Sequence, residues 1–169
     1  MSANTSEITS YQRFLILQGA IILLIGFVIG FGFLFFLMGE ISLWPIPGRI
    51  DYQMPGTYDA WRMAHMEAIT NGIMLWVIAG LLPALSTLFT KIKWLVVIPT
   101  IIAWTIVLAS AIDPLFDDAR GLMMKEWSNL ANTSAFLLFY PGVMLSFVLV
   151  IAVIVAIYKK KKEDPSLTG

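Results

Sequence analysis

Near its start the chain carries the uncharged stretch FLILQGAIILLIGFVIGFGFLFFLM, which runs from Phe14 to Met38 with Gln18 as its only strongly polar side chain. A helix needs roughly 20 mainly apolar residues to cross the hydrocarbon core of a membrane, and this stretch is longer than that. It is also longer than the apolar core of a signal peptide, and no small-residue cleavage pattern follows it. We therefore expect a retained transmembrane helix.

Three further stretches have the same character, and the expected spans are residues 14–38, 61–88, 94–112 and 135–158. Of the 169 residues, 59% are hydrophobic and 13% are charged, whereas soluble domains carry about 25% charged residues. The sequence predicts an all-α fold, an integral membrane four-helix bundle that forms a single domain over residues 1–169.

Composition also excludes several classes of chemistry. The chain has no cysteine, which rules out disulfides, thiolate nucleophiles, iron–sulfur clusters and cysteine-ligated zinc. The formal net charge is zero, and nothing in the sequence indicates a nucleic-acid partner. The expected surroundings are a lipid bilayer.

Lysine and arginine residues are distributed unequally between the two ends of the expected helices. Seven lie on the side of both termini and the middle loop, and four lie on the side of the other two loops: Arg13, Lys91, Lys93 and Lys159 to Lys162 against Arg49, Arg62, Arg120 and Lys125. Positively charged residues mark the cytoplasmic side. We expect a multi-pass protein of the cytoplasmic (inner) membrane with both termini and the middle loop inside.

His65 is the only histidine, and it lies just inside the outer boundary of the second span. It is either an interfacial side chain hydrogen-bonded to water or a carbonyl, or a metal ligand. Ala68 and Gly72 share its helical face. These small residues either let a neighbouring helix approach closely or leave a slot for a flat macrocycle. Any haem would have one histidine ligand from the chain.

Asn71 lies on a different stripe of the same helix, together with Glu67 and Met74. Its amide either joins two helices by a hydrogen bond or, in an oligomer, faces a cavity that it shares with the histidine of a neighbouring subunit. Both interpretations remain open from the residues alone.

The aromatic residues near the expected helix ends are interpreted as an interfacial belt without chemistry: Trp44, Tyr58, Trp61, Trp94 and Trp127. Asp113, Asp117 and Asp118 follow the third span, where carboxylates are usually solvated. With one histidine in the chain, we expect no cluster of side chains that holds a bare metal ion.

The second span resembles that of the styrene oxide isomerase family, small four-span bacterial membrane proteins. The family pattern is W-x-x-A-H, then N-G-x-M after five residues, then L-P-x-L, and it is matched by Trp61, Ala64, His65, Asn71, Gly72, Met74, Leu82, Pro83 and Leu85. Pro55-Gly56, six residues before the tryptophan, also matches, and weaker similarities are Pro47-Gly48, Arg120-Gly121-Leu122 and Pro141. Length and hydropathy resemble the family along nearly the whole chain.

This resemblance implies a homotrimer with haem b at the subunit interfaces, its iron held by His65. Because Ala68 and Gly72 share the helical face of His65, we then expect them beside the cofactor. Ferric iron then acts as a Lewis acid on a small lipophilic epoxide, which rearranges to a carbonyl compound without net redox change. The alternatives are a haem-binding membrane protein without isomerase activity, such as a sensor or redox component, and a cofactor-free structural protein.

The chain departs from the family in the third span. Family members carry an asparagine and a tyrosine two and six residues after a tryptophan, and the positions matched from Trp104 are Ile106 and Ser110. A shift by one residue gives Val107 and Ala111 and does not restore the pair. We expect Asn71, with Ser110 and Asp113 as replacements for the missing polar side chains, to act as the catalytic residues.

Overall fold

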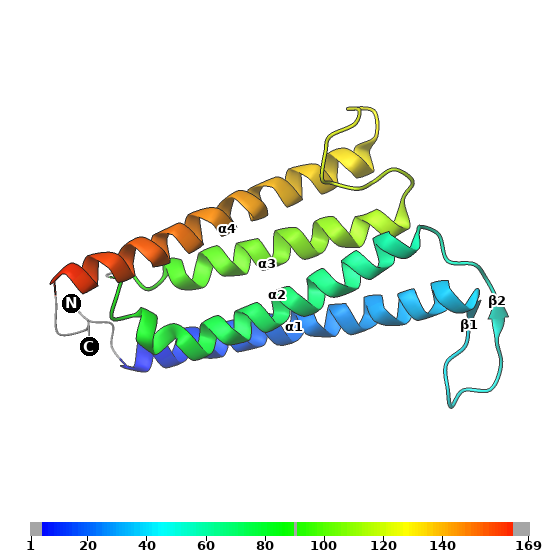
Figure 1. Ribbon diagram of the computed structural model, residues 1–169. Helices are drawn as coiled ribbons and strands as arrows, with labels where there is room; N and C mark the ends of the chain where they lie inside the picture. The colour runs from blue at the N-terminus through cyan, green and yellow to red at the C-terminus, as the bar shows by residue number, and fades with distance from the viewer. Residues whose placement is uncertain (1–4, 90, 164–169) are drawn as a thin grey trace.

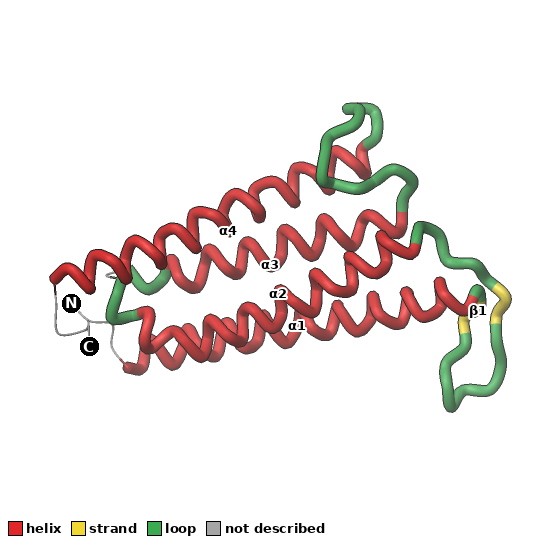
Figure 2. The backbone as a smooth tube through the Cα atoms, viewed as in Figure 1, coloured by secondary structure: helices red, strands yellow, loops and turns green. Residues whose placement is uncertain are grey.

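The computed structural model of the protein describes residues 5–89 and 91–163, which fold into four long helices (Figure 1). These are α1 (Thr5–Met38), α2 (Tyr58–Leu85), α3 (Trp94–Ile112) and α4 (Leu130–Glu163), and the 3-10 helix η1 (Asp113–Leu115) follows α3. Two short strands, β1 (Glu40–Ile41) and β2 (Ile50–Asp51), pair antiparallel in the loop between α1 and α2, with Glu40 opposite Asp51 (Figure 2). The predicted all-α bundle is confirmed.

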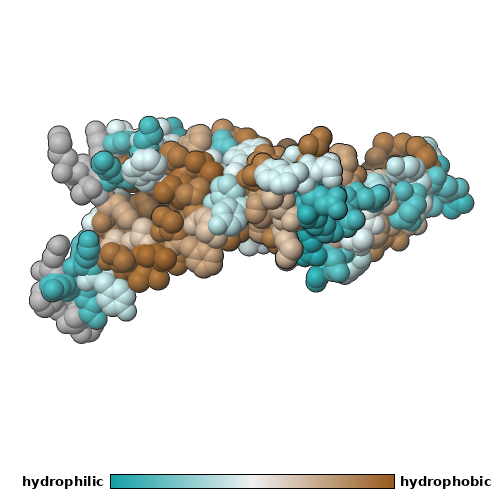
Figure 3. Space-filling model, turned by 90° about the horizontal axis from the view of Figure 1, so that it is seen from above, coloured by the Kyte–Doolittle hydropathy of each residue, from teal (hydrophilic) through white to brown (hydrophobic). Residues whose placement is uncertain are grey.

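All four helices are long and apolar enough to cross a membrane. Hydrophilic residues gather toward the two ends of the molecule, and hydrophobic residues dominate between them (Figure 3). The start of α1, the end of α4 and the connection from α2 to α3 lie at one end, whereas the hairpin loop and the α3–α4 loop lie at the other (Figure 1). The lysine-rich sequence segments therefore share one end of the bundle.

Helix ends differ from the expected spans where local signals override hydropathy. Helix α2 begins at Tyr58 and not at residue 61, because the Thr57 hydroxyl accepts a hydrogen bond from the Ala60 amide and caps the helix. It ends at Leu85, two residues after Pro83, so Leu88 lies outside it. Helices α1 and α4 extend beyond residues 14–38 and 135–158, because polar turns continue each helix outside its apolar stretch.

Each helix packs on the next one in the chain, and α3 also contacts α1, where Trp104 Nε1 donates a hydrogen bond to Gln18 Oε1 (2.9 Å). Helix α1 packs along α2 and α3 packs along α4, while within the described residues the backbone of α4 does not come close to that of α1 or α2. Only 6% of the apolar window of α4 is buried. One face of α4 therefore remains open to lipid or to another copy of the chain.

Glycines bring α1 and α2 close together. A Cβ atom added at Gly19 would lie 2.8 Å from the Gly72 carbonyl oxygen. Side-chain hydrogen bonds to backbone carbonyls reinforce the same contact, from Gln12 Nε2 to Ala79 O (2.8 Å) and from Trp76 Nε1 to Ile16 O (2.9 Å). Such bonds satisfy polar groups that lipid cannot.

Candidate functional site

His65 lies half-buried in the contact between α2 and α1. Its Nδ1 atom is 2.8 Å from the carbonyl oxygen of Gly26. A carbonyl only accepts hydrogen bonds, so Nδ1 donates to it, and this bond selects the tautomer of the neutral imidazole in which Nε2 keeps its lone pair. This is the arrangement by which proteins orient a metal-ligating histidine, with one ring nitrogen bonded to a carbonyl and the other free to coordinate.

The other ring nitrogen of His65, Nε2, is not enclosed by the protein. Nε2 of His65 has no hydrogen-bond partner among the described residues, and no buried side-chain nitrogen or oxygen atom of those residues lacks a partner. Nε2 must therefore be accessible at the surface of the chain. A group that coordinates His65 would bind on the outside of the α1–α2 pair.

The small residues beside His65 are covered by α1. Ala68 is fully buried, and a Cβ atom added at Gly26 would lie 3.2 Å from its Cβ. A Cβ atom added at Gly72 would lie 2.6 Å from Leu23 Cγ. Within one chain, the small face of α2 allows close helix packing, and no slot for a macrocycle lies between α1 and α2.

Asn71 is buried, and its Nδ2 atom donates to the backbone carbonyl of Glu67, one turn earlier in α2, at 2.9 Å. Its amide thus bonds within its own helix and does not join two helices. The amide oxygen has no partner among the residues that the structure describes.

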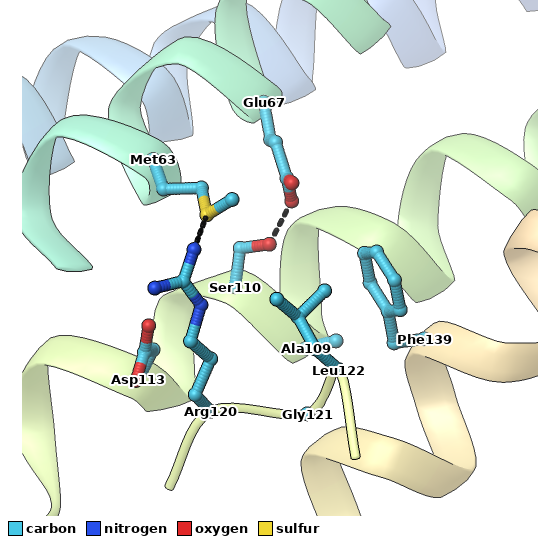
Figure 4. Close-up of a pocket in the computed structure, with 9 residues that line it drawn as sticks. All are labelled: Met63, Glu67, Ala109, Ser110, Asp113, Arg120, Gly121, Leu122 and Phe139. Carbon is cyan, nitrogen blue, oxygen red and sulfur yellow. Dashed lines mark hydrogen bonds between the residues drawn. The ribbon is translucent and has the colours of Figure 1, made fainter. Parts of the chain in front are cut away.

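A polar pocket lies between α2, α3 and α4, at the end of the bundle that carries the α3–α4 loop (Figure 4). Ser110 of α3 donates a hydrogen bond to the carboxylate of Glu67, and this bond joins the two helices. Asp113 lines the same pocket, so two of the three residues expected to be catalytic lie together and Asn71 does not. The other lining residues are Met63, Ala109, Arg120, Gly121, Leu122 and Phe139.

Sequence reasoning did not select Glu67 or Arg120 as site residues. The signal that could have identified Glu67 is an acidic residue two positions after His65, in a helix long and apolar enough to cross a membrane. Arg120 extends from the α3–α4 loop, and its guanidinium lies 3.1 Å from Met63 Sδ and forms no ion pair with any residue in the described part of the chain.

The pocket is small and is separated from the histidine. Its volume has room for about one water molecule, not for an aromatic epoxide. Glu67 follows His65 by two residues, which places the two side chains about 200° apart around the helix axis. One chain therefore presents the histidine and the carboxyl group on different faces of α2.

Loop contacts hold the pocket in place. Asn132 of α4 is fully buried, donates to the carbonyl oxygens of Arg120 (2.7 Å) and Met123 (3.0 Å), and accepts from the Lys125 amide (2.8 Å). In the same loop, the Lys125 ammonium donates a hydrogen bond to Asp118, which holds the pKa of that carboxyl below its usual value. The backbone that carries Arg120 is thus fixed to the start of α4.

Two glycines of the family-like motifs allow close packing of the α1–α2 and α3–α4 loops. A Cβ atom at Gly121 would lie 2.5 Å from the Ala135 carbonyl carbon, and one at Gly56 would lie 2.4 Å from the Pro114 carbonyl oxygen. Gly56 also has a φ of +92°, which disfavours other residues. Both positions need glycine because another part of the backbone approaches closely.

We expect Asn132→Ala to destabilise the protein by about 1–3 kcal/mol, because it leaves buried backbone groups of the loop without partners. Denaturant unfolding in detergent micelles measures the change. Ser128→Ala, at an exposed position of the same loop, is the control and should change stability little. Equal stability of Asn132→Ala and Ser128→Ala would contradict the role of Asn132 in fixing the loop.

Trp61 was expected in the interfacial aromatic belt, but it is buried between α2 and α1. Its side chain is only 4% exposed, donates from Nε1 to the Pro55 carbonyl oxygen (2.8 Å) and packs against Gly32 of α1. By contrast, Trp44, Tyr58, Trp94 and Trp127 are exposed. Trp61 is a core residue because glycine on α1 leaves room for its ring.

The described residues of one chain do not form a metal site with several side-chain ligands. Among residues 5–89 and 91–163, no group of three or more histidine, aspartate or glutamate side chains could hold a metal ion. His65 Nε2 is the one imidazole donor of the chain.

The comparisons with known proteins agree with the motifs of the second span. No curated protein matches the chain. The family model described as styrene oxide isomerase matches residues 11–158, a range that includes His65, the polar pocket and nearly all of the four helices. The resemblance seen in the sequence is confirmed, and the chain belongs to the styrene oxide isomerase family.

Proposed function

We propose that the protein is a haem b-dependent membrane isomerase that rearranges a small lipophilic epoxide to a carbonyl compound. Family membership makes epoxide isomerisation the first candidate. The observation that carries the haem assignment is the geometry of His65, whose Nδ1 proton is bonded to Gly26 O while Nε2 is free at the surface. The donor set, one imidazole nitrogen, would fit a haem held by a single histidine.

Haem b would supply a ferric iron that acts as a Lewis acid on the epoxide oxygen. His65 would hold the cofactor, with Ala68 and Gly72 shaping the helix contact behind it. Asn71, Ser110 and Asp113 would orient the substrate, and the bond from Ser110 to Glu67 supports a role for Ser110 as an oriented hydroxyl. The apolar helices around them would exclude water from the reacting group.

A second copy of the chain would complete this site. The surface outside α1 and α2 can cover one face of a macrocycle, while the polar pocket lies on another side of α2. We propose a homotrimer, in which the pocket side of one subunit lies near the histidine side of its neighbour. Native mass spectrometry in a mild detergent tests this assembly, and a uniform population of monomers would contradict it.

The distribution of lysine and arginine leads us to place the protein in the cytoplasmic membrane with both termini inside. We expect a reporter fused after Lys162 to behave as cytoplasmic and one inserted beside Gln53 to behave as periplasmic, because seven of the eleven lysine and arginine residues lie at the end of the termini. Paired phosphatase and fluorescent-protein fusions measure this orientation. The reverse pattern would overturn it.

One observation favours a second candidate, a haem-binding membrane protein without isomerase activity. The polar pocket is small, and the third span has Ile106 and Ser110 where the family carries its asparagine and tyrosine. Such a protein would bind haem and respond to gases or to redox state without converting epoxides.

Purified protein distinguishes these candidates in two measurements. An isomerase should show a haem absorption band and, in its ferric form, convert at least one member of a panel of aryl and alkyl epoxides to the aldehyde or ketone. A ferric, haem-loaded protein that converts none would leave the non-catalytic haem protein. A protein that binds no added haemin would contradict both.

A further inference from the structure

The ring of His65 is confined by a backbone position on α1. A Cβ atom added at Gly30 would lie 2.9 Å from His65 Cε1 and 3.0 Å from Nδ1, whereas it would lie 3.8 Å from Nε2. Real Cβ atoms do not approach ring atoms at 2.9 Å, so any side chain at position 30 would displace the imidazole. The collision would fall on the hydrogen-bonded side of the ring.

The displacement would break a specific bond. The Nδ1 atom of His65 reaches the Gly26 carbonyl oxygen, one helical turn before Gly30 on the same face of α1. That bond selects the tautomer and holds the ring plane. Because α1 lacks a side chain at position 30, the imidazole can lie flat enough against the helix to make it.

We propose that Gly30 is a positioning residue for the cofactor ligand, since it allows the His65–Gly26 bond that occupies Nδ1 and leaves Nε2 directed away from the Gly26 carbonyl. This inference rests on the proposed haem function. Helix α1 supplies no ligand, but it thereby determines which imidazole nitrogen is available to the iron and in which direction that nitrogen points.

The test is Gly30→Ala in the full-length protein, with haemin titration and the absorption spectrum as readouts. We expect the apparent Kd for haemin to rise about 10- to 100-fold, the usual loss when the partner of a metal-ligating histidine is disturbed, and the spectrum of the bound fraction to change. Gly80→Ala is the matched control, because a Cβ atom at Gly80 meets nothing within 4 Å. It should bind haemin as the wild type does.

A double variant separates ring placement from helix packing. In a His65→Gly background supplemented with free imidazole, the ring is not attached to α2 and can move away from a side chain at residue 30. If Gly30 acts through His65, Gly30→Ala should then cost little further haemin affinity. It should also fold in that background even where the single variant does not.

The outcomes are separable from those of the proposed function. Failure of the wild type to bind haemin would overturn both proposals. Normal haemin binding and an unchanged spectrum in Gly30→Ala would overturn this inference alone. An equal loss of affinity with and without the His65 side chain would also overturn it, since Gly30 would then act through general packing of α1 on α2.

Discussion

His65→Ala is expected to abolish stoichiometric haem binding and with it any epoxide conversion, because the chain has no second histidine that could replace the ligand. The fold should survive. The imidazole is half-buried and makes one hydrogen bond, to Gly26 O, and a bond of this kind contributes about 1 kcal/mol. Haem content per polypeptide and the absorption spectrum measure the first effect, and circular dichroism in detergent measures the second.

Gln12→Ala provides the matched control for this substitution. Gln12 is also half-buried on one of these two helices, and it also donates one hydrogen bond across their contact, to Ala79 O at 2.8 Å. It lies at the other end of the pair, far from His65. Loss of haem in both variants would point to helix packing, and retention of haem with an unaltered spectrum in His65→Ala would contradict the assignment of the ligand.

The spans could be predicted because an apolar stretch in lipid has few structural options. Backbone groups inside the membrane must be satisfied within the segment, so a stretch such as residues 14–38 forms a helix. Helix ends depend on single residues, and the Thr57 cap and Pro83 shifted both ends of α2 by a few positions. Hydropathy averages over a window and does not register such signals.

The candidate site could be predicted only in part, for a related reason. His65 follows from residue type, depth and the family pattern, but its bond to Gly26 depends on the register between α1 and α2. The pair formed by Glu67 and Ser110 joins residues 43 positions apart in the chain. Trp61 lies near an expected helix end, as an interfacial tryptophan would. It is buried because Gly32 of α1 leaves room for its ring, and that contact depends on how the two helices pack.

The structure also changes what is needed to restore the family's polar side chain in the third span. Ser110 faces Glu67, and Phe139 and Leu122 line the same pocket, which has room for about a water molecule. A tyrosine ring at position 110 would collide with the Glu67 side chain. Ile106 lies against α4, since a Cβ atom at Gly142 would be 2.8 Å from its Cγ1, so an asparagine there would face a helix contact.

Ser110→Tyr combined with Glu67→Ala is therefore expected to raise the conversion of styrene oxide by about a hundredfold over the wild type, the lower range for a well-placed proton-donating group. Removing the carboxylate frees the space that the phenol needs, and the new hydroxyl can then reach the oxygen of the substrate. Initial rates of phenylacetaldehyde formation by haem-loaded protein measure the effect.

Ser110→Tyr alone should be less active than the double variant and less stable than the wild type, because the ring and the Glu67 side chain compete for one pocket. Glu67→Ala alone, which opens the pocket without adding a donor, is the control for the space itself. If the double variant is no faster than Glu67→Ala, the pocket does not adjoin the reacting epoxide, and Ser110 has a purely structural role in joining α2 to α3.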